Sequence, residues 1–113
     1  TGLGGLSWRN NPTATIHEDS DQVIHFGEEV DRTFYGTADR VIDLESASSH
    51  YQFTQDGFCD SVVWNPGPKV CANIPDLEPE SWLHYVCVEA ASVQQPVQLQ
   101  PGGVWRGTQR VKA

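Results

Sequence analysis

Apolar residues occur in short runs along the whole chain, and turn residues separate the runs. The two clearest runs are 61–65 and 82–89, which we expect to be central strands. Other runs, most of which alternate apolar and polar positions, are 6–8, 23–26, 30–35, 40–46, 48–54, 93–100 and 104–111. Short strands at intervals of roughly 8–12 residues are typical of antiparallel sandwiches and barrels. We therefore predict an all-β fold, with a loop and one helical turn over 69–80.

Each of the two clearest runs carries a polar residue at its far end, Asn65 in the run 61–65 and Glu89 in the run 82–89. A carboxylate behind a buried strand is costly unless it is paired or opens into a cleft. Burial raises the pKa of a carboxyl group toward the range in which it acts as a general base. Glu89 is therefore either a catalytic base or an ordinary solvated glutamate at a strand end.

Composition narrows the class of protein. The chain of 113 residues fits a single domain with one modest core. A formal net charge of −8 disfavours nucleic acid as a partner, because binding it requires clustered Lys and Arg. No apolar run reaches about 18 residues, so we expect no membrane span. The three cysteines form no CxxC pair, which favours free thiols and a reducing, cytoplasmic setting.

The four histidines do not form a recognisable metal motif. His17 lacks the second histidine that an HExxH site requires, so we predict no metal. His17 lies in a polar stretch and is expected to be solvated. His25, His50 and His84 alternate with apolar neighbours, which predicts exposed positions on sheets.

Asp31 also has two interpretations. It is either a surface acid paired weakly with the neighbouring Arg32, or a carboxylate at a strand start that accepts hydrogen bonds from sugar hydroxyls. Trp64 and Trp82 could stack on a sugar, although tryptophan in an apolar strand more often belongs to a core.

Three strings carry a family resemblance. They are residues 29–34 (Glu-Val-Asp-Arg-Thr-Phe), 62–68 (Val-Val-Trp-Asn-Pro-Gly-Pro) and 86–91 (Val-Cys-Val-Glu-Ala-Ala). In this order and spacing, the chain resembles the carboxy-terminal half of the hexose-6-phosphate mutarotases, which are aldose 1-epimerase-like proteins. The resemblance implies that residues 1–113 form one antiparallel β-sandwich, as part of a larger galactose mutarotase-like supersandwich.

The resemblance also implies a function and two site residues. The expected reaction interconverts the α and β anomers of a hexose 6-phosphate, or of a free hexose, without a cofactor. Glu89 matches the family's general base, and Asp31 matches the aspartate that holds substrate hydroxyls.

The chain departs from the family pattern at several positions. Phe34 stands where the family usually has tyrosine, and no histidine of this chain matches the family's histidine pair or general acid. The alternative is therefore a non-catalytic sugar-binding or dimerising remnant, which would self-associate through an exposed sheet face.

Overall fold

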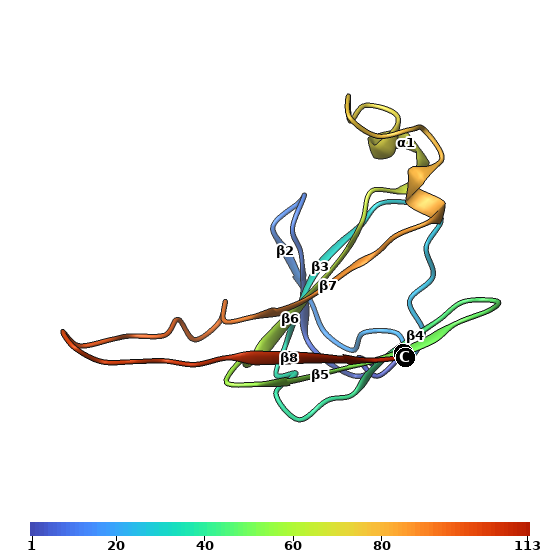
Figure 1. The fold of residues 1–113 in the computed structure, drawn as a ribbon. Helices are drawn as coiled ribbons and strands as arrows, with labels where there is room; N and C mark the ends of the chain where they lie inside the picture. The colour runs from blue at the N-terminus through green and yellow to red at the C-terminus, as the bar shows by residue number, and fades with distance from the viewer.

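The strands form two antiparallel sheets in the computed structural model, which describes residues 1–113 (Figure 1). The first sheet has five strands in the order β2-β1-β3-β6-β7, and the second has three in the order β4-β5-β8. Strands of the first sheet are β1 (Trp8–Asn10), β2 (Thr15–His17), β3 (Val30–Tyr35), β6 (Asp60–Asn65) and β7 (Cys87–Ala91). Those of the second sheet are β4 (Ile42–Glu45), β5 (His50–Asp56) and β8 (Thr108–Lys112). The prediction of an all-β antiparallel sandwich is confirmed.

The core lies between the two sheets. Val30, Phe34 and Val63 contribute to it from the first sheet, Ile42 from the second, and Leu3 from the entering segment. Side chains alternate along a strand, so every second residue of β3 and β6, starting from the neighbours of these core positions, faces the opposite side of the first sheet. We call that side the outer face, and it carries Asp31 of β3.

Several predicted strands are correct, and others are displaced. The run 30–35 coincides with β3, and the run 61–65 with β6 extended by one residue. The run 23–26 is not a strand, although it packs Ile24 and Phe26 against the core. Alternation reports burial of every second side chain, and a strand also needs a partner for its backbone groups. The run 93–100 is irregular for the same reason.

The structure also contains elements that the pattern missed. β2 lies in a polar stretch and its side chains are exposed, so no apolar alternation marks it. The turn before it places Ala14 at φ 56, a left-handed conformation. The helical turn expected over 69–80 is the short helix α1 (Gly67–Cys71), which begins two residues earlier, whereas the 3-10 turn at Ser81–Leu83 was not expected. These two short helices lack the length and the apolar character that crossing a bilayer requires.

Buried polar side chains fix the loops around β6. Asp60 is fully buried at the start of β6, and its Oδ2 accepts hydrogen bonds from the backbone N–H groups of Val93 and Gln94, both at 2.8 Å. At the other end of the strand, Asn65 Nδ2 donates to the carbonyls of Trp82 and Tyr85, both at 2.8 Å. The two ends of β6 therefore fix the segments that enter and leave β7.

Asn65 also explains why β7 begins later than predicted. The run 82–89 was expected to be one strand, whereas β7 starts only at Cys87. The bonds from Asn65 hold the carbonyls of Trp82 and Tyr85 at the end of β6, and neither residue pairs with β6. The chain consequently makes a 3-10 turn there before it joins β6.

An extended arm projects from the sandwich between β7 and β8, as Figure 1 shows. We define the arm as residues 95–107. Its one backbone hydrogen bond within the arm closes a turn from the N–H of Gly103 to the carbonyl of Gln100. Large apolar side chains along it are exposed, including Leu99 at 57% and Val104 at 77%. Trp105 packs edge-on against Phe58 at a ring distance of 5.0 Å.

The β4–β5 hairpin carries a pH-sensitive cluster. Asp43 Oδ1 accepts hydrogen bonds from Gln52 Nε2 at 3.0 Å and from His50 Nε2 at 2.7 Å. The bond from Gln52 and then that from His50 hold the pKa of Asp43 below its ordinary value of 3.8. A carboxyl group whose pKa is lower in the folded than in the unfolded state stabilises the fold above its unfolded pKa. This contribution is lost as the pH falls through the lowered pKa.

We therefore expect the free energy of unfolding to decrease as the pH is lowered from about 5 to about 3, with a smaller decrease in Asp43→Asn. Urea unfolding at several pH values measures both slopes. Asp39→Asn, at an exposed loop position, is the matched control and should keep the wild-type slope. Equal slopes for Asp43→Asn and the wild type would contradict the prediction.

Candidate functional site on the outer face of the first sheet

The two predicted site residues lie on the same face of the first sheet. Asp31 pairs with Trp64 across β3 and β6, and Trp64 pairs with Cys87 across β6 and β7. Glu89 lies two residues beyond Cys87, so it shares that side of the sheet with Asp31. Both carboxylates therefore face away from the core.

The strand register also sets their separation. Asp31 and Glu89 are two strands apart and offset by two residues along the strands. With strands about 4.8 Å apart and a rise of about 3.4 Å per residue, their Cα atoms are about 12 Å apart. The two carboxyl groups can therefore contact opposite sides of one small ligand that lies over β6.

Asp31 is held in place by Asn11, which follows β1. Asn11 Nδ2 donates to Asp31 Oδ1 at 2.7 Å, and the backbone N–H of Asn11 donates to the carbonyl of Asp31 at 2.9 Å. The expected weak pair between Asp31 and Arg32 is absent. Arg32 faces the opposite side, where its guanidinium lies 4.2 Å from the centre of the Trp8 ring.

Glu89 differs from the expectation in its position. It was predicted at a strand end behind a buried run, whereas it occupies the middle of β7 and its side chain is exposed. β7 is an edge strand of its sheet, which leaves this side chain open to solvent. The one ion pair of the chain joins His50 and Asp43, so Glu89 has no charged partner. An exposed, unpaired carboxylate is free to accept a proton from a ligand.

Trp64 and Cys87 occupy the surface between the two carboxylates. Trp64 is half-buried, and its ring lies 5.9 Å from that of Tyr85. Burial raises the pKa of the Cys87 thiol, and the nearby Glu89 carboxylate raises it further. A thiol with a raised pKa is a poor nucleophile, so this face favours proton transfer over covalent chemistry at sulfur.

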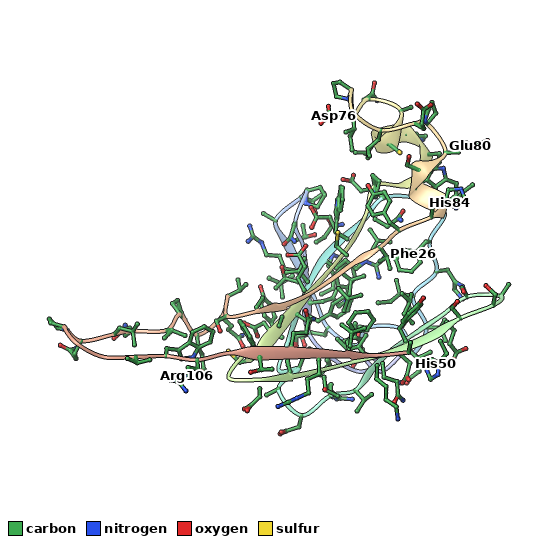
Figure 2. The ribbon with its side chains drawn as sticks, viewed as in Figure 1. Phe26, His50, Asp76, Glu80, His84 and Arg106 are labelled. Atoms are coloured by element: carbon green, nitrogen blue, oxygen red, sulfur yellow. The ribbon has the colours of Figure 1, made fainter.

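No histidine occupies a strand position on this face. His17 pairs with Trp8 and stacks on its ring at 4.2 Å, on the core side of the sheet. His50 belongs to the second sheet, and His84 follows the 3-10 turn, as Figure 2 shows. His25 lies in an irregular segment. Of the three histidines expected in strands, only His50 is in one. The structure contains no group of three His, Cys, Asp or Glu side chains able to hold a metal ion.

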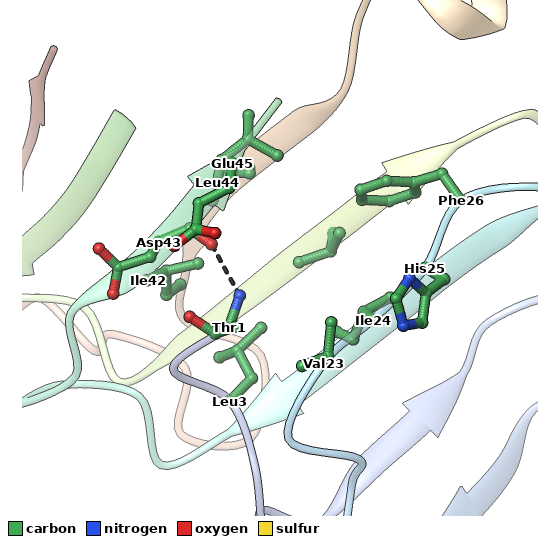
Figure 3. A pocket seen from close by; sticks show the side chains of 12 residues that line it. Thr1, Leu3, Val23, Ile24, His25, Phe26, Ile42, Asp43, Leu44 and Glu45 are labelled. Atoms are coloured by element: carbon green, nitrogen blue, oxygen red, sulfur yellow. Dashed lines mark hydrogen bonds between the residues drawn. The ribbon is translucent and has the colours of Figure 1, made fainter. Parts of the chain in front are cut away.

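A largely apolar cavity of the chain lies apart from the carboxylates. It has a volume of about 340 Å³ and opens between the sheets beside the amino terminus (Figure 3). Most of its lining is apolar, with His25, Asp43 and Glu45 among the polar groups. The Thr1 ammonium donates to the carbonyl of Asp43 at 2.7 Å there. Neither Asp31 nor Glu89 lines it, so this cavity is separate from the candidate site.

Asn11 is the one residue of this site that the sequence did not indicate. The string Asn10-Asn11-Pro12 is typical of a turn, and a turn is what it forms after β1. Its contact with Asp31 joins residues 20 positions apart, which no local pattern reveals.

The sequence of the chain is similar to that of known proteins. The sequence model of the family described as Aldose 1-epimerase matches residues 5–112. A protein of Cenchrus ciliaris named "Putative glucose-6-phosphate 1-epimerase" is 34% identical over 110 residues, which cover 94% of this chain. The match covers 33% of that relative, so the chain spans about a third of its length.

Proposed function

Since the chain belongs to the aldose 1-epimerase family, we propose that it acts on the anomeric centre of a hexose 6-phosphate, with Glu89 as general base and Asp31 as substrate anchor. The observation that carries this proposal is the shared face of the two carboxylates, two strands apart with Trp64 between them. The name of the Cenchrus ciliaris relative, which specifies glucose 6-phosphate, supports the 6-phosphate.

Each residue has a defined part in the proposed reaction. A Glu89 oxygen accepts the proton of the anomeric hydroxyl, and the electron pair of that O–H bond forms the C1 carbonyl as the bond from C1 to the ring oxygen breaks. The ring oxygen takes a proton from a general acid. Rotation about C1–C2 and reclosure on the other carbonyl face then give the opposite anomer. None of the four histidines occupies a strand position on this face, and the proposal assigns the acid to none of them.

Asp31 binds rather than transfers protons in this scheme. Its Oδ1 already accepts from Asn11, which leaves Oδ2 to accept a hydrogen bond from a sugar hydroxyl. Hydrogen bonds to charged groups contribute about 1.5–3 kcal/mol, or roughly 10- to 100-fold in affinity. Trp64 offers an aromatic surface on which the apolar side of a sugar ring can stack.

We expect Asp31→Asn to weaken glucose 6-phosphate binding by about 10-fold or more while the chain stays folded. Titration followed by amide chemical shifts measures the dissociation constant and shows whether the shifted residues lie on β3, β6 and β7. Asp39→Asn makes the same charge change on an exposed loop and should bind as the wild type does. Equal weakening in both variants would show that the anchor is not Asp31.

The alternative function is sugar binding without turnover. The observation that favours it is that none of the four histidines occupies a strand position on the face of Asp31 and Glu89, where a general acid would be needed. A binding module would retain the affinity loss in Asp31→Asn and would leave the anomer exchange rate at its spontaneous value.

A further inference from the structure

The side chain of Asn11 bridges two residues of the outer face. Its Nδ2 donates to Asp31 Oδ1 at 2.7 Å, and its Oδ1 accepts from Thr33 Oγ1 at 3.1 Å. The direction of both bonds follows from chemistry, because an ionised carboxylate only accepts hydrogen bonds and therefore requires the amide nitrogen. Thr33 then meets the amide oxygen and must donate its hydroxyl proton.

Asn11 is itself held from several sides. Its backbone N–H donates to the carbonyl of Asp31 at 2.9 Å, and its carbonyl accepts from the N–H of Ala14 at 3.3 Å. Thr33, whose hydroxyl donates to the amide oxygen of Asn11, is only 4% exposed. The amide is therefore fixed to the β1–β2 turn on one side and to β3 on the other.

We propose that Asn11 is a positioning residue, which holds the Asp31 carboxylate in one rotamer with Oδ2 directed at the sugar. This inference rests on the function proposed above for Asp31. An aspartate on an open sheet face would otherwise sample several χ1 rotamers, and ligand binding would have to select one of them. A side chain that is already ordered loses less conformational freedom on binding, which raises affinity.

The chain offers a matched control in the preceding residue. Asn10 is the last residue of β1, it has the same side chain, and it pairs with Arg32 on the opposite side of the sheet. Its side chain makes no hydrogen bond. Asn10→Ala therefore removes the same atoms next to the same turn without affecting Asp31.

The experiment compares Asn11→Ala, Asn11→Asp and Asn10→Ala with the wild type. Three-bond couplings between Hα and Hβ of Asp31 report its χ1 rotamer without any ligand. We expect one rotamer in the wild type and in Asn10→Ala, and averaged couplings in Asn11→Ala. Asn11→Asp keeps the shape and places a second carboxylate against the first, so the couplings should change there as well.

Binding of glucose 6-phosphate supplies the second measurement. Asn11→Ala should weaken it by about three- to ten-fold, less than Asp31→Asn, and the double variant should bind no more weakly than Asp31→Asn alone. A purely structural role would instead produce losses that add.

The possible outcomes separate the positioning role from the proposed function. Unchanged Asp31 couplings in Asn11→Ala, or the same effect in Asn10→Ala, would overturn the positioning role. Averaged couplings with no sugar binding by the wild type would support the positioning of the carboxylate and would contradict the proposed function.

Discussion

Glu89→Gln is expected to leave the fold intact and to lower the rate of anomer exchange by about 100- to 10,000-fold, the usual contribution of general base catalysis. The amide has nearly the same shape as the carboxylate and cannot accept the anomeric proton. Glu89 is exposed in the middle of β7 with no charged partner, so its replacement removes no structural contact. Two-dimensional exchange NMR of glucose 6-phosphate measures the rate directly, with substrate well above the dissociation constant.

Glu80→Gln is the control for this variant. Glu80 is exposed beside the 3-10 turn, away from the outer face of the first sheet (Figure 2), and its replacement makes the same change of charge. It should exchange anomers at the wild-type rate. Equal rates for Glu89→Gln and the wild type, above the spontaneous rate, would remove Glu89 from the reaction. A wild-type rate equal to the spontaneous rate would favour the non-catalytic binding function.

Asn65→Asp is expected to destabilise the chain by about 3–4 kcal/mol, although it changes only one group of atoms. Asn65 is 1% exposed, and its amide nitrogen donates to two carbonyls at 2.8 Å. A carboxylate can donate to neither, and it would place a buried negative charge against both carbonyl oxygens. The acceptor bond from the N–H of Gly67 at 2.9 Å would survive and would not offset the loss.

Urea unfolding of Asn65→Asp and of Asn73→Asp provides the test. Asn73 Nδ2 also donates to a carbonyl, that of Lys69 at 2.8 Å, but its side chain is exposed and water can replace the bond. Asn73→Asp should therefore cost less than about 1 kcal/mol. Similar losses in the two variants would mean that burial of Asn65 contributes little. Because Asn65 holds the segment that leads into β7, its loss should also shift the amide resonances around Glu89.

The pattern of apolar residues predicted best the strands that lie in the centre of the first sheet. β3 and β6 are flanked on both sides by other strands, so they have both a buried face and backbone partners. The pattern failed where a segment is buried without a ladder, as at Ile24 and Phe26, and where a ladder forms without burial, as in β2. Strand partners are distant in the sequence, so the local pattern of apolar residues does not reveal which segments pair.

The candidate site residues were predicted from the family resemblance rather than from the pattern of apolar residues. Asp31 and Glu89 were identified through two short strings, and the strand register brings them to one face. Periodicity alone gave Glu89 the wrong setting, because an edge strand exposes a position that a central strand would bury. Asn11 had no signal of its own, since its role depends on the pairing of β1 with β3.

The arm has a consequence for the second sheet. β8 pairs only with β5, and all five of its residues are exposed, so it has little apolar burial to hold it in place. Its position depends on the ladder with β5 and on the covalent tether that the arm provides, which keeps its effective concentration near β5 high. Exposed segments with few backbone hydrogen bonds are also where proteases first cut a folded chain. A single cleavage in the arm would remove this tether between β7 and β8 and leave β8 held to β5 by noncovalent contacts alone.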